Sequence, residues 1–248
     1  MDLPKPSTII DASWQLYLKE FRTLLPLIIL SLIPGIIGLG LAGLPRDTTT
    51  LLLTMLVVVV YAWVEGGMTH VLGNIVLKRP AGVKDSLTRA LSRLGIIFGL
   101  MFITQFFTAV GVVAFIIPGI FLGYIFSFAM PSLVLGEKNI WPSLMQSYRL
   151  AMTKPLLQTI NAVVGPWLFW QLVIFLTSGI LVMLVGALER IAPGIAFGYP
   201  LATARTLPFV ILCIASFARP IVIACRVMVY VALHHVEERT TSTESPHL

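Results

Sequence analysis

The stretch VKDSLTRALSRLGIIFGLMFITQFFTAVGVVAFII (residues 83–117) decides the fold of this chain. It opens with a short amphipathic segment and continues without interruption into an apolar run that contains no charged residue over 94–117. At 1.5 Å per residue, such a run is long enough to cross about 30 Å of hydrocarbon as a helix. Two faces are separated at helical spacing in the amphipathic part: Val83, Leu87, Ala90 and Leu94 on one, and Asp85, Arg89, Ser92 and Arg93 on the other.

The same arrangement occurs three times, with amphipathic segments that begin near Ser7, Val83 and Ile140, each followed by a pair of long apolar spans. It predicts an all-α polytopic membrane protein with six transmembrane helices, built from three repeats of an interfacial amphipathic helix plus a helical hairpin. The first segment carries Ile10, Trp14, Tyr17 and Phe21 on its apolar face, and the third carries Trp141, Leu144, Tyr148 and Met152. We place the repeats at about 5–77, 80–136 and 138–236, in one integral membrane domain (1–238) with a flexible cytoplasmic tail (239–248).

Composition agrees with a membrane protein. Of the 248 residues, 57% are hydrophobic and only 11% are charged, whereas a soluble domain is about 25% charged. The net charge of +6 does not indicate nucleic-acid binding, because no basic stripe with interleaved aromatic residues accompanies it. We interpret it as Lys and Arg that keep loops on the anionic side of the membrane.

The six spans are predicted at 23–43, 51–76, 95–117, 118–136, 158–188 and 207–233. Pro118-Gly119 is expected to form the tight turn between the third and fourth spans, and Gly165-Pro166 to bend the fifth. Thr48, Thr49 and Thr50 are N-cap candidates for the second span, and the outer loop 189–206 is expected to be irregular.

Basic residues set the orientation. Twelve Lys and Arg residues lie before, between or after spans on one side, and three (Arg46, Arg190 and Arg205) lie on the other. The positive-inside rule then places both termini in the cytoplasm, and we predict a bacterial inner-membrane location. The amphipathic helices are expected either to orient the hairpins as elbows in the headgroup plane, or to form a cytoplasmic collar that binds headgroups or a partner protein. The candidate interfacial or headgroup residues are Trp14, Arg89, Arg93, Trp141, Arg149 and Arg226.

A further set of motifs lies in the second half of the chain: Pro118-Gly119-Ile120, Ala129-Met130-Pro131, Glu137-Lys138, Ser143-Leu144, Ser147, Arg149-Leu150, Lys154 and the closing run Arg226-Val227-Met228-Val229-Tyr230. With these motifs the chain resembles the bacterial inner-membrane family called YciC, and it is similar in layout to the membrane domain attached to some glycerophosphodiester phosphodiesterases. The resemblance implies a six-span inner-membrane protein, without a settled activity and without catalytic residues to transfer. Glu65 and Arg219 depart from the family pattern.

Two ionisable residues fall deep inside predicted spans. Glu65 and Arg219 lie fourteen and twelve residues from the outer ends of their spans, roughly 18–21 Å in at 1.5 Å per residue. A lone charge at that depth costs about 3 kcal/mol on insertion scales, so we predict that the two form an ion pair inside the bundle. The pair either fixes helix register only, or belongs to a solute or headgroup site beside helices broken at Pro131 and Pro220. Arg226 either snorkels to headgroups or forms a second polar step along an inward pathway.

Catalytic signatures are missing. The histidines His70, His234, His235 and His247 form no H-E-x-x-H, no second intramembrane carboxylate provides a dyad, and no P-loop is present. Cys213 and Cys225 are twelve residues apart in one span, about 18 Å along a helix, and are interpreted as packing residues. We therefore predict no enzymatic activity, no cofactor and no metal.

Two functions remain open. The first is a scaffold or accessory factor in envelope or lipid homeostasis that acts through its cytoplasmic collar, with membrane lipids and a protein as partners. The alternative is a small transporter or lipid-handling permease with a polar site at the midplane, formed by Glu65, Arg219, Pro131 and Pro220. The oligomeric state is not predicted.

Overall fold

The computed structural model describes residues 5–41, 44–45, 47–80, 82–152, 156–191 and 202–243, and these residues form helices and connecting turns without a strand. Six segments are long and apolar enough to cross a membrane, which confirms the six predicted spans: Phe21–Leu41, Thr48–Val76, Leu94–Ala114, Ile117–Leu135, Ile160–Ile180 and Ile211–His234. The helices are α1 (Pro6–Lys19), α2 (Phe21–Leu41), α3 (Thr48–Val76), α4 (Val83–Ser92), α5 (Leu94–Ala114), α6 (Ile116–Phe126), α7 (Ala129–Leu135), α8 (Ile140–Met152), α9 (Leu156–Ile191) and α10 (Ala202–Thr243).

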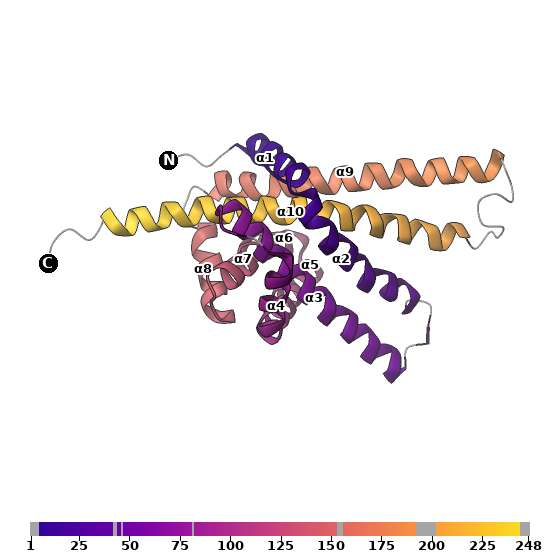
Figure 1. Cartoon of the computed structure of the whole chain (residues 1–248), viewed down its shortest axis with the longest axis horizontal. Coiled ribbons are helices and arrows are strands. Elements are labelled where there is room, and N and C mark those ends of the chain that lie inside the picture. Colours follow the sequence, from indigo (N-terminus) through magenta and orange to yellow (C-terminus); the bar gives the residue numbers. More distant parts are fainter. Residues whose placement is uncertain are drawn as a thin grey trace.

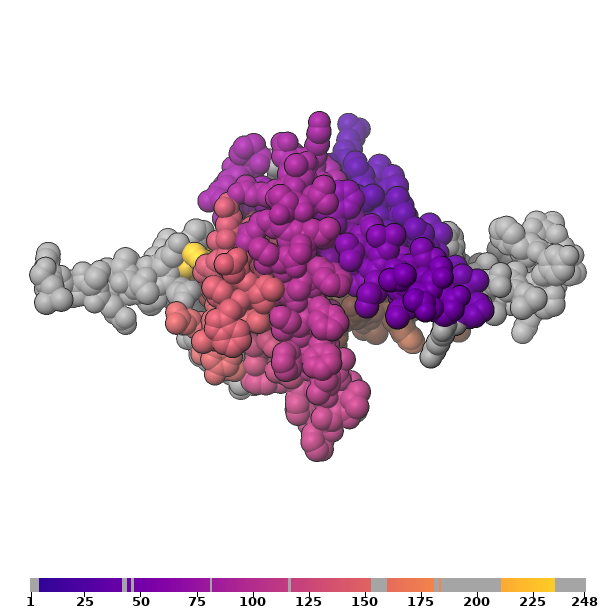
Figure 2. All heavy atoms as spheres, turned by 90° about the horizontal axis from the view of Figure 1, so that it is seen from below, coloured from indigo at the N-terminus to yellow at the C-terminus, as the bar shows by residue number. Residues whose placement is uncertain are grey.

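The six spans do not form one parallel bundle. Helices α9 and α10 lie side by side, α1 crosses near them, and α2 and α3 form a hairpin that diverges from this pair (Figure 1). The α5–α6 hairpin takes a different direction, and Figure 2 shows its connected end projecting from the rest of the molecule.

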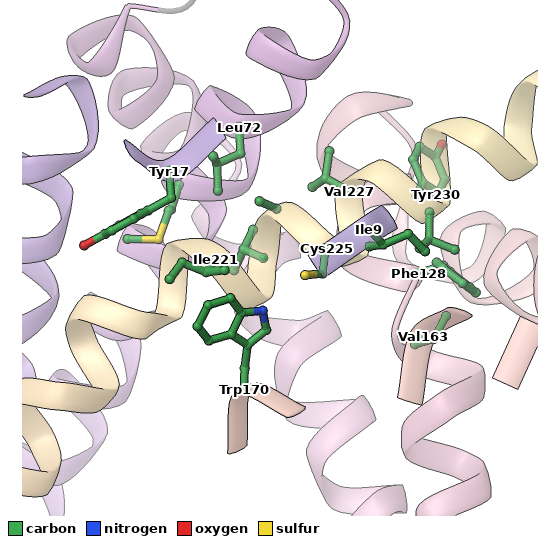
Figure 3. Close-up of a cluster of buried hydrophobic side chains, with 14 of the residues drawn as sticks. Ile9, Tyr17, Leu72, Phe128, Val163, Trp170, Ile221, Cys225, Val227 and Tyr230 are labelled. Atoms are coloured by element: carbon green, nitrogen blue, oxygen red, sulfur yellow. The ribbon is translucent and has the colours of Figure 1, made fainter. Parts of the chain in front are cut away.

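Helix α10 is the centre of the hydrophobic core. Its segment 221–233 is buried on several sides, with Ile221, Cys225 and Val227 all less than one-tenth exposed. Figure 3 shows buried side chains of other helices gathered around it, including Ile9 of α1, Leu72 of α3 and Trp170 of α9. A helix that is apolar all round belongs at the centre of a bundle. The same segment contains one charged residue, Arg226.

The three amphipathic segments form the helices α1, α4 and α8, as predicted. They turn small or polar residues toward the protein: Ser13 of α1, Ser86 of α4 and Ser143 of α8 are all buried. Helix α1 also buries Ile9 and Tyr17, whereas on α8 large apolar residues face outward in a stripe at helical spacing, with Trp141 70% exposed. The other members of the stripe are Met145, Tyr148 and Met152. Such a surface suits the boundary between headgroups and hydrocarbon.

Two predicted helix ends are wrong. Helix α3 is capped by Asp47, whose carboxylate accepts the Thr50 N–H at 2.7 Å, and not by a threonine. That hydrogen bond holds the pKa of Asp47 below its usual value, since it favours the charged form. The hairpin turn lies at Phe115, which has an extended backbone, whereas Pro118 lies in the first turn of α6. Proline is tolerated there because backbone N–H groups in the first turn have no acceptor within the helix.

The remaining boundaries concern prolines and the ends of long helices. Helix α9 continues through Pro166. Helix α10 reaches Thr243, so helix extends into the predicted tail 239–248, whose last five residues lie outside the described part. Most of the predicted outer loop 189–206 also lies outside the described residues, and so do Arg46 and Lys154.

Candidate functional site

The predicted pairing of Glu65 and Arg219 is confirmed. Arg219 Nε lies 3.3 Å from Glu65 Oε2, and both side chains are largely buried, at 20% and 16% exposed. The guanidinium carbon of Arg219 also lies 3.8 Å from the ring centroid of Tyr61, one helical turn before Glu65. A cation over an aromatic face gains further electrostatic stabilisation when water is excluded. Helices α3 and α10 are therefore joined at this point by a charge pair and a cation–π contact.

The glycines that follow Glu65 let two other helices approach α3 closely. A Cβ on Gly66 would lie 2.7 Å from Ile97 Cδ1 of α5, and one on Gly67 would lie 2.7 Å from Leu87 Cδ2 of α4. Both distances are shorter than real Cβ contacts, so a larger residue at either position would require the Ile97 or Leu87 side chain to move. The close approach fixes Glu65 relative to the start of the α5–α6 hairpin.

A cavity of about 380 Å³ lies between the α5–α6 hairpin, α9 and the charged residues. Its volume is in the range of small-molecule sites. Its wall combines apolar side chains with hydroxyl, amide and charged groups. The lining residues are Glu65, Leu100, Met101, Thr104, Gln105, Thr108, Val112, Gly119, Ile120, Gly123, Tyr124, Phe126, Ser127, Met130, Val163, Val164, Trp167 and Arg226.

The cavity is elongated along the hairpin. Leu100 and Val112 both line it from α5, and twelve residues of helix span about 18 Å. Glu65 and Arg226 contribute the charged part of the wall, whereas Val112 and Gly119 lie near the apolar turn of the hairpin. The wall is therefore amphipathic over the length of a lipid-like chain.

Arg226 contributes to the cavity wall, and Arg219 does not. Arg226 is half-buried, and in the part of the chain that the structure describes no hydrogen bond or ion pair involves its guanidinium. Its place in the same cavity wall as Glu65 agrees with the interpretation of Arg226 as a second polar step along an inward pathway, and both interpretations stay predictions. Sequence reasoning ranked it as a headgroup residue because the cavity was not foreseen.

The two prolines of the predicted site have different surroundings. Pro131 lies in the first turn of α7, just after the break between α6 and α7 at Ser127–Phe128, so the fourth span is interrupted as predicted. The sixth span is not, because α10 continues through Pro220. A proline removes one helical hydrogen bond, and tight packing around a central helix can hold the helix together despite this loss. Both prolines are buried, and neither lines the cavity.

The interfacial arginines make contacts within the protein. Arg89 of α4 forms an exposed ion pair with Glu137. Arg93 donates to the carbonyl of Leu133 at 3.0 Å and also to that of Lys138. The carbonyls at a helix C-terminus lack partners within the helix, so Arg93 closes the end of α7. Both arginines thus attach α4 to the α7–α8 connection, and their headgroup binding stays a prediction.

The other candidate interfacial residues lie on the outer surface. Trp14 is 42% exposed and stacks on Tyr17 and Trp170 with centroid distances of 5.8 and 5.7 Å. Trp141 and Arg149 are exposed on α8. None of the three lines the cavity, so the structure separates an outer group of candidates from an inner one.

The polar face of α5 was missed at the sequence level. Thr104, Gln105 and Thr108 recur at helical spacing within an otherwise apolar span, and all three line the cavity. That periodicity was the available signal. Trp167 carried no comparable signal, because an aromatic residue in a span is common.

Other polar groups in the described residues hold the fold together. His70 Nδ1 lies 2.9 Å from Ser86 Oγ and 3.2 Å from Asn74 Nδ2, which links α3 to α4. Cys225 donates to Ser13 Oγ at 3.1 Å and so joins α10 to α1. Among the described residues, no cluster of three His, Cys, Asp or Glu side chains has the arrangement of a metal site.

The fold and the site define the class of the chain: an all-helical protein with six helical segments suited to cross a membrane and, among them, a largely apolar cavity with two charged groups in its wall. Comparisons with protein-family models, with curated proteins and with solved structures found no match.

Proposed function

We propose that this chain is a non-enzymatic multi-pass membrane protein that binds an amphipathic molecule, such as a lipid, in the cavity between the α5–α6 hairpin and α9. This is the lipid-handling alternative of the two functions predicted from the sequence. The single observation that carries it is the cavity itself, with charged groups (Glu65 and Arg226) in an otherwise largely apolar wall. An empty cavity of this size is unfavourable, because its lining atoms lose packing contacts. A bound amphiphile would restore these contacts.

Access from the membrane supports the proposal. Ile120 is 55% exposed and Trp167 is 36% exposed, and both line the cavity from opposite helices. A molecule dissolved in the hydrocarbon would therefore reach the cavity between α6 and α9 without crossing water. This route suits an amphiphile better than a water-soluble solute.

The setting follows from the sequence. The excess of Lys and Arg on one side favours cytoplasmic termini in a bacterial inner membrane, and the motifs quoted above favour a place near the YciC family. The three-repeat organisation is supported by the amphipathic helices α1, α4 and α8, each of which precedes a pair of spans.

The scaffold function stays a second candidate, because α4 presents an exposed, charged surface. Lys84, Asp85 and Arg89 all face outward there, as a surface that binds a protein partner would require. The structure offers no comparable cavity for that function, and we therefore place it second.

A cavity-filling variant tests the proposal. A Cβ on Gly123 would lie 3.6 Å from Thr108 Cγ2, an ordinary contact, so Gly123→Leu adds its bulk to the cavity without displacing backbone. Gly40→Leu is the matched control, because nothing lies within 4 Å of a Cβ at Gly40. The protein is extracted without detergent into native-lipid particles, and mass spectrometry identifies the molecules that accompany it.

We expect an amphiphile enriched over bulk lipid with the unmodified chain and with Gly40→Leu, and at least tenfold less of it with Gly123→Leu. An enrichment that Gly123→Leu leaves unchanged would overturn the cavity as the binding site. Bulk lipid together with a recurrent protein partner in all three samples would favour the scaffold function.

A further inference from the structure

We propose that the cavity selects an amphiphile whose polar end carries one negative charge on an oxyanion, a carboxylate or a phosphodiester, and that Arg226 binds this group. The inference rests on the proposed function and specifies its ligand. It also moves the recognition role from Arg219, which the sequence suggested, to a residue seven positions further along α10.

The charge count is the first argument. Three charged side chains lie in the interior of two candidate membrane spans: Glu65 in Thr48–Val76, and Arg219 and Arg226 in Ile211–His234. Glu65 forms an ion pair with Arg219 at 3.3 Å and also interacts electrostatically with Arg226 at longer range, so the three side chains together carry a net charge of +1. A net charge among membrane helices is unfavourable, so an anion bound at Arg226 would compensate it.

The position of Arg226 is the second argument. It is the one charged residue in the buried segment 221–233 of the central helix, and it lines the cavity. Guanidinium groups bind carboxylate and phosphate oxygens through two parallel N–H donors. In the described part of the chain no other group occupies these donors, so they are free to bind a ligand.

The shape of the cavity is the third argument. From its charged part it follows α5 for about 18 Å toward the hairpin turn, between Gly123 of α6 and Trp167 of α9. A ligand with its anionic group at Arg226 would lay an apolar chain along this length. Thr104 and Gln105 would face the segment between the head and the chain, where lipids carry hydroxyl or ester groups.

Quenching of Trp167 fluorescence by brominated chains provides the test. The full-length protein, purified in detergent micelles, is titrated with dibrominated stearate, dibrominated phosphatidylglycerol and dibrominated phosphatidylcholine. The first two carry a single negative charge as a carboxylate or a phosphodiester, and the third is neutral overall. The Trp167→Phe variant gives the part of the signal that comes from the other tryptophans.

We expect at least one of the two anionic probes to quench Trp167 at a concentration about tenfold lower than phosphatidylcholine does. Arg226→Gln should abolish this difference, because a charge-assisted hydrogen-bonded pair corresponds to about a factor of ten or more in affinity. Arg226→Lys should keep part of it. Arg22→Gln is the matched control, an exposed arginine at the start of α2, and should change nothing.

The outcomes separate the two proposals. Equal quenching by all three probes, removed by Gly123→Leu, would overturn the selectivity for anions and leave the amphiphile site in place. No quenching of Trp167 by any probe would overturn both. The comparison of anionic and neutral probes uses the unmodified chain, so a failure of Arg226→Gln to fold would not prevent the test. Which anionic probe binds better distinguishes a fatty acid from a phospholipid.

Discussion

Two arginines on the central helix α10, Arg219 and Arg226, differ in their interactions. Arg219 is tied to Glu65 and Tyr61 at once, whereas Arg226 is free to bind elsewhere. Two arginines on the same helix, seven residues apart, thus have different roles, because only Arg219 forms an ion pair with Glu65. The first role is structural, and the second is available for a ligand.

The Glu65–Arg219 pair predicts the result of a charge exchange. Arg219→Glu should destabilise the fold by about 3 kcal/mol, since it places two carboxylates together where water is scarce. The double variant Glu65→Arg with Arg219→Glu should recover most but not all of the folded protein, because the cation then leaves its place over Tyr61. Fluorescence-detected gel filtration after a heating series measures the folded fraction.

The control for this exchange is Asp11→Arg, at an exposed carboxylate of α1 that forms no ion pair with a described basic residue. Combined with Arg219→Glu, it should give no recovery. Recovery by this control as well, or none by the Glu65→Arg partner, would show that the contact between Glu65 and Arg219 does not stabilise the fold.

The residue scale also shows what the sequence could predict. The depth of a residue along a span can be counted from the sequence, and an unpaired charge at that depth is unfavourable in any membrane protein. The pairing of Glu65 with Arg219 could therefore be predicted. The neighbourhood of Arg226 could not be counted in the same way. It depends on the direction that α5 and α6 take, which is set by tertiary packing at Gly66 and Gly67.

At the scale of elements, the α5–α6 hairpin is the part on which the cavity depends. Its two helices touch backbone to backbone near the turn. A Cβ on Gly119 would lie 2.5 Å from the backbone nitrogen of Val112 and 2.7 Å from its Cα. A backbone nitrogen or Cα cannot rotate away as a side chain can, so any larger residue at position 119 must separate the helices.

Gly119→Ala should therefore destabilise the hairpin, by about 1–3 kcal/mol as for overpacked sites in general. Gly123→Ala, one turn later on the same helix, is the matched control, because its Cβ would meet only Thr108 Cγ2 at 3.6 Å. It should be neutral or slightly stabilising, as alanine favours helix over glycine. Thermal unfolding in micelles compares the two, and equal midpoints would contradict the close backbone contact.

Element boundaries were the least predictable feature. The periodic pattern found all six spans, because burial in hydrocarbon requires about 20 apolar residues whatever the details. The pattern failed at prolines, because a proline is compatible both with a helix and with a turn or break in the chain. Pro118 starts a helix where a turn was expected, and Pro220 lies within a continuous helix where a break was expected. Local sequence does not distinguish these cases, since neighbouring helices supply the deciding contacts.

On the scale of the whole molecule, large parts of the outer surface are apolar, whereas the surface of a soluble protein is mostly polar. Helix α8 buries Ser143 and exposes Trp141, and the end of the α5–α6 hairpin is fully apolar, with Val113 88% exposed. Such a surface is typical of a protein that contacts a membrane. The central position of α10, by contrast, could not be read from composition, because all six spans are similarly apolar.

The apolar end of the hairpin permits a test of how the whole chain lies in the membrane. Helix α5 has 21 residues, about 31 Å at 1.5 Å per residue, and it begins beside Arg93 on the side proposed to be cytoplasmic. Its other end should therefore reach the opposite surface.

In a chain whose two cysteines are replaced by serine, Val113→Cys should react with a membrane-impermeant maleimide added to intact cells. Lys84→Cys, exposed on α4, should react only after the cells are permeabilised. Labelling of Lys84→Cys in intact cells would invert the proposed orientation. Protection of Val113→Cys in both conditions would mean that the α5–α6 hairpin ends within the hydrocarbon. The third and fourth spans would then enter and leave the membrane on the same side without crossing it.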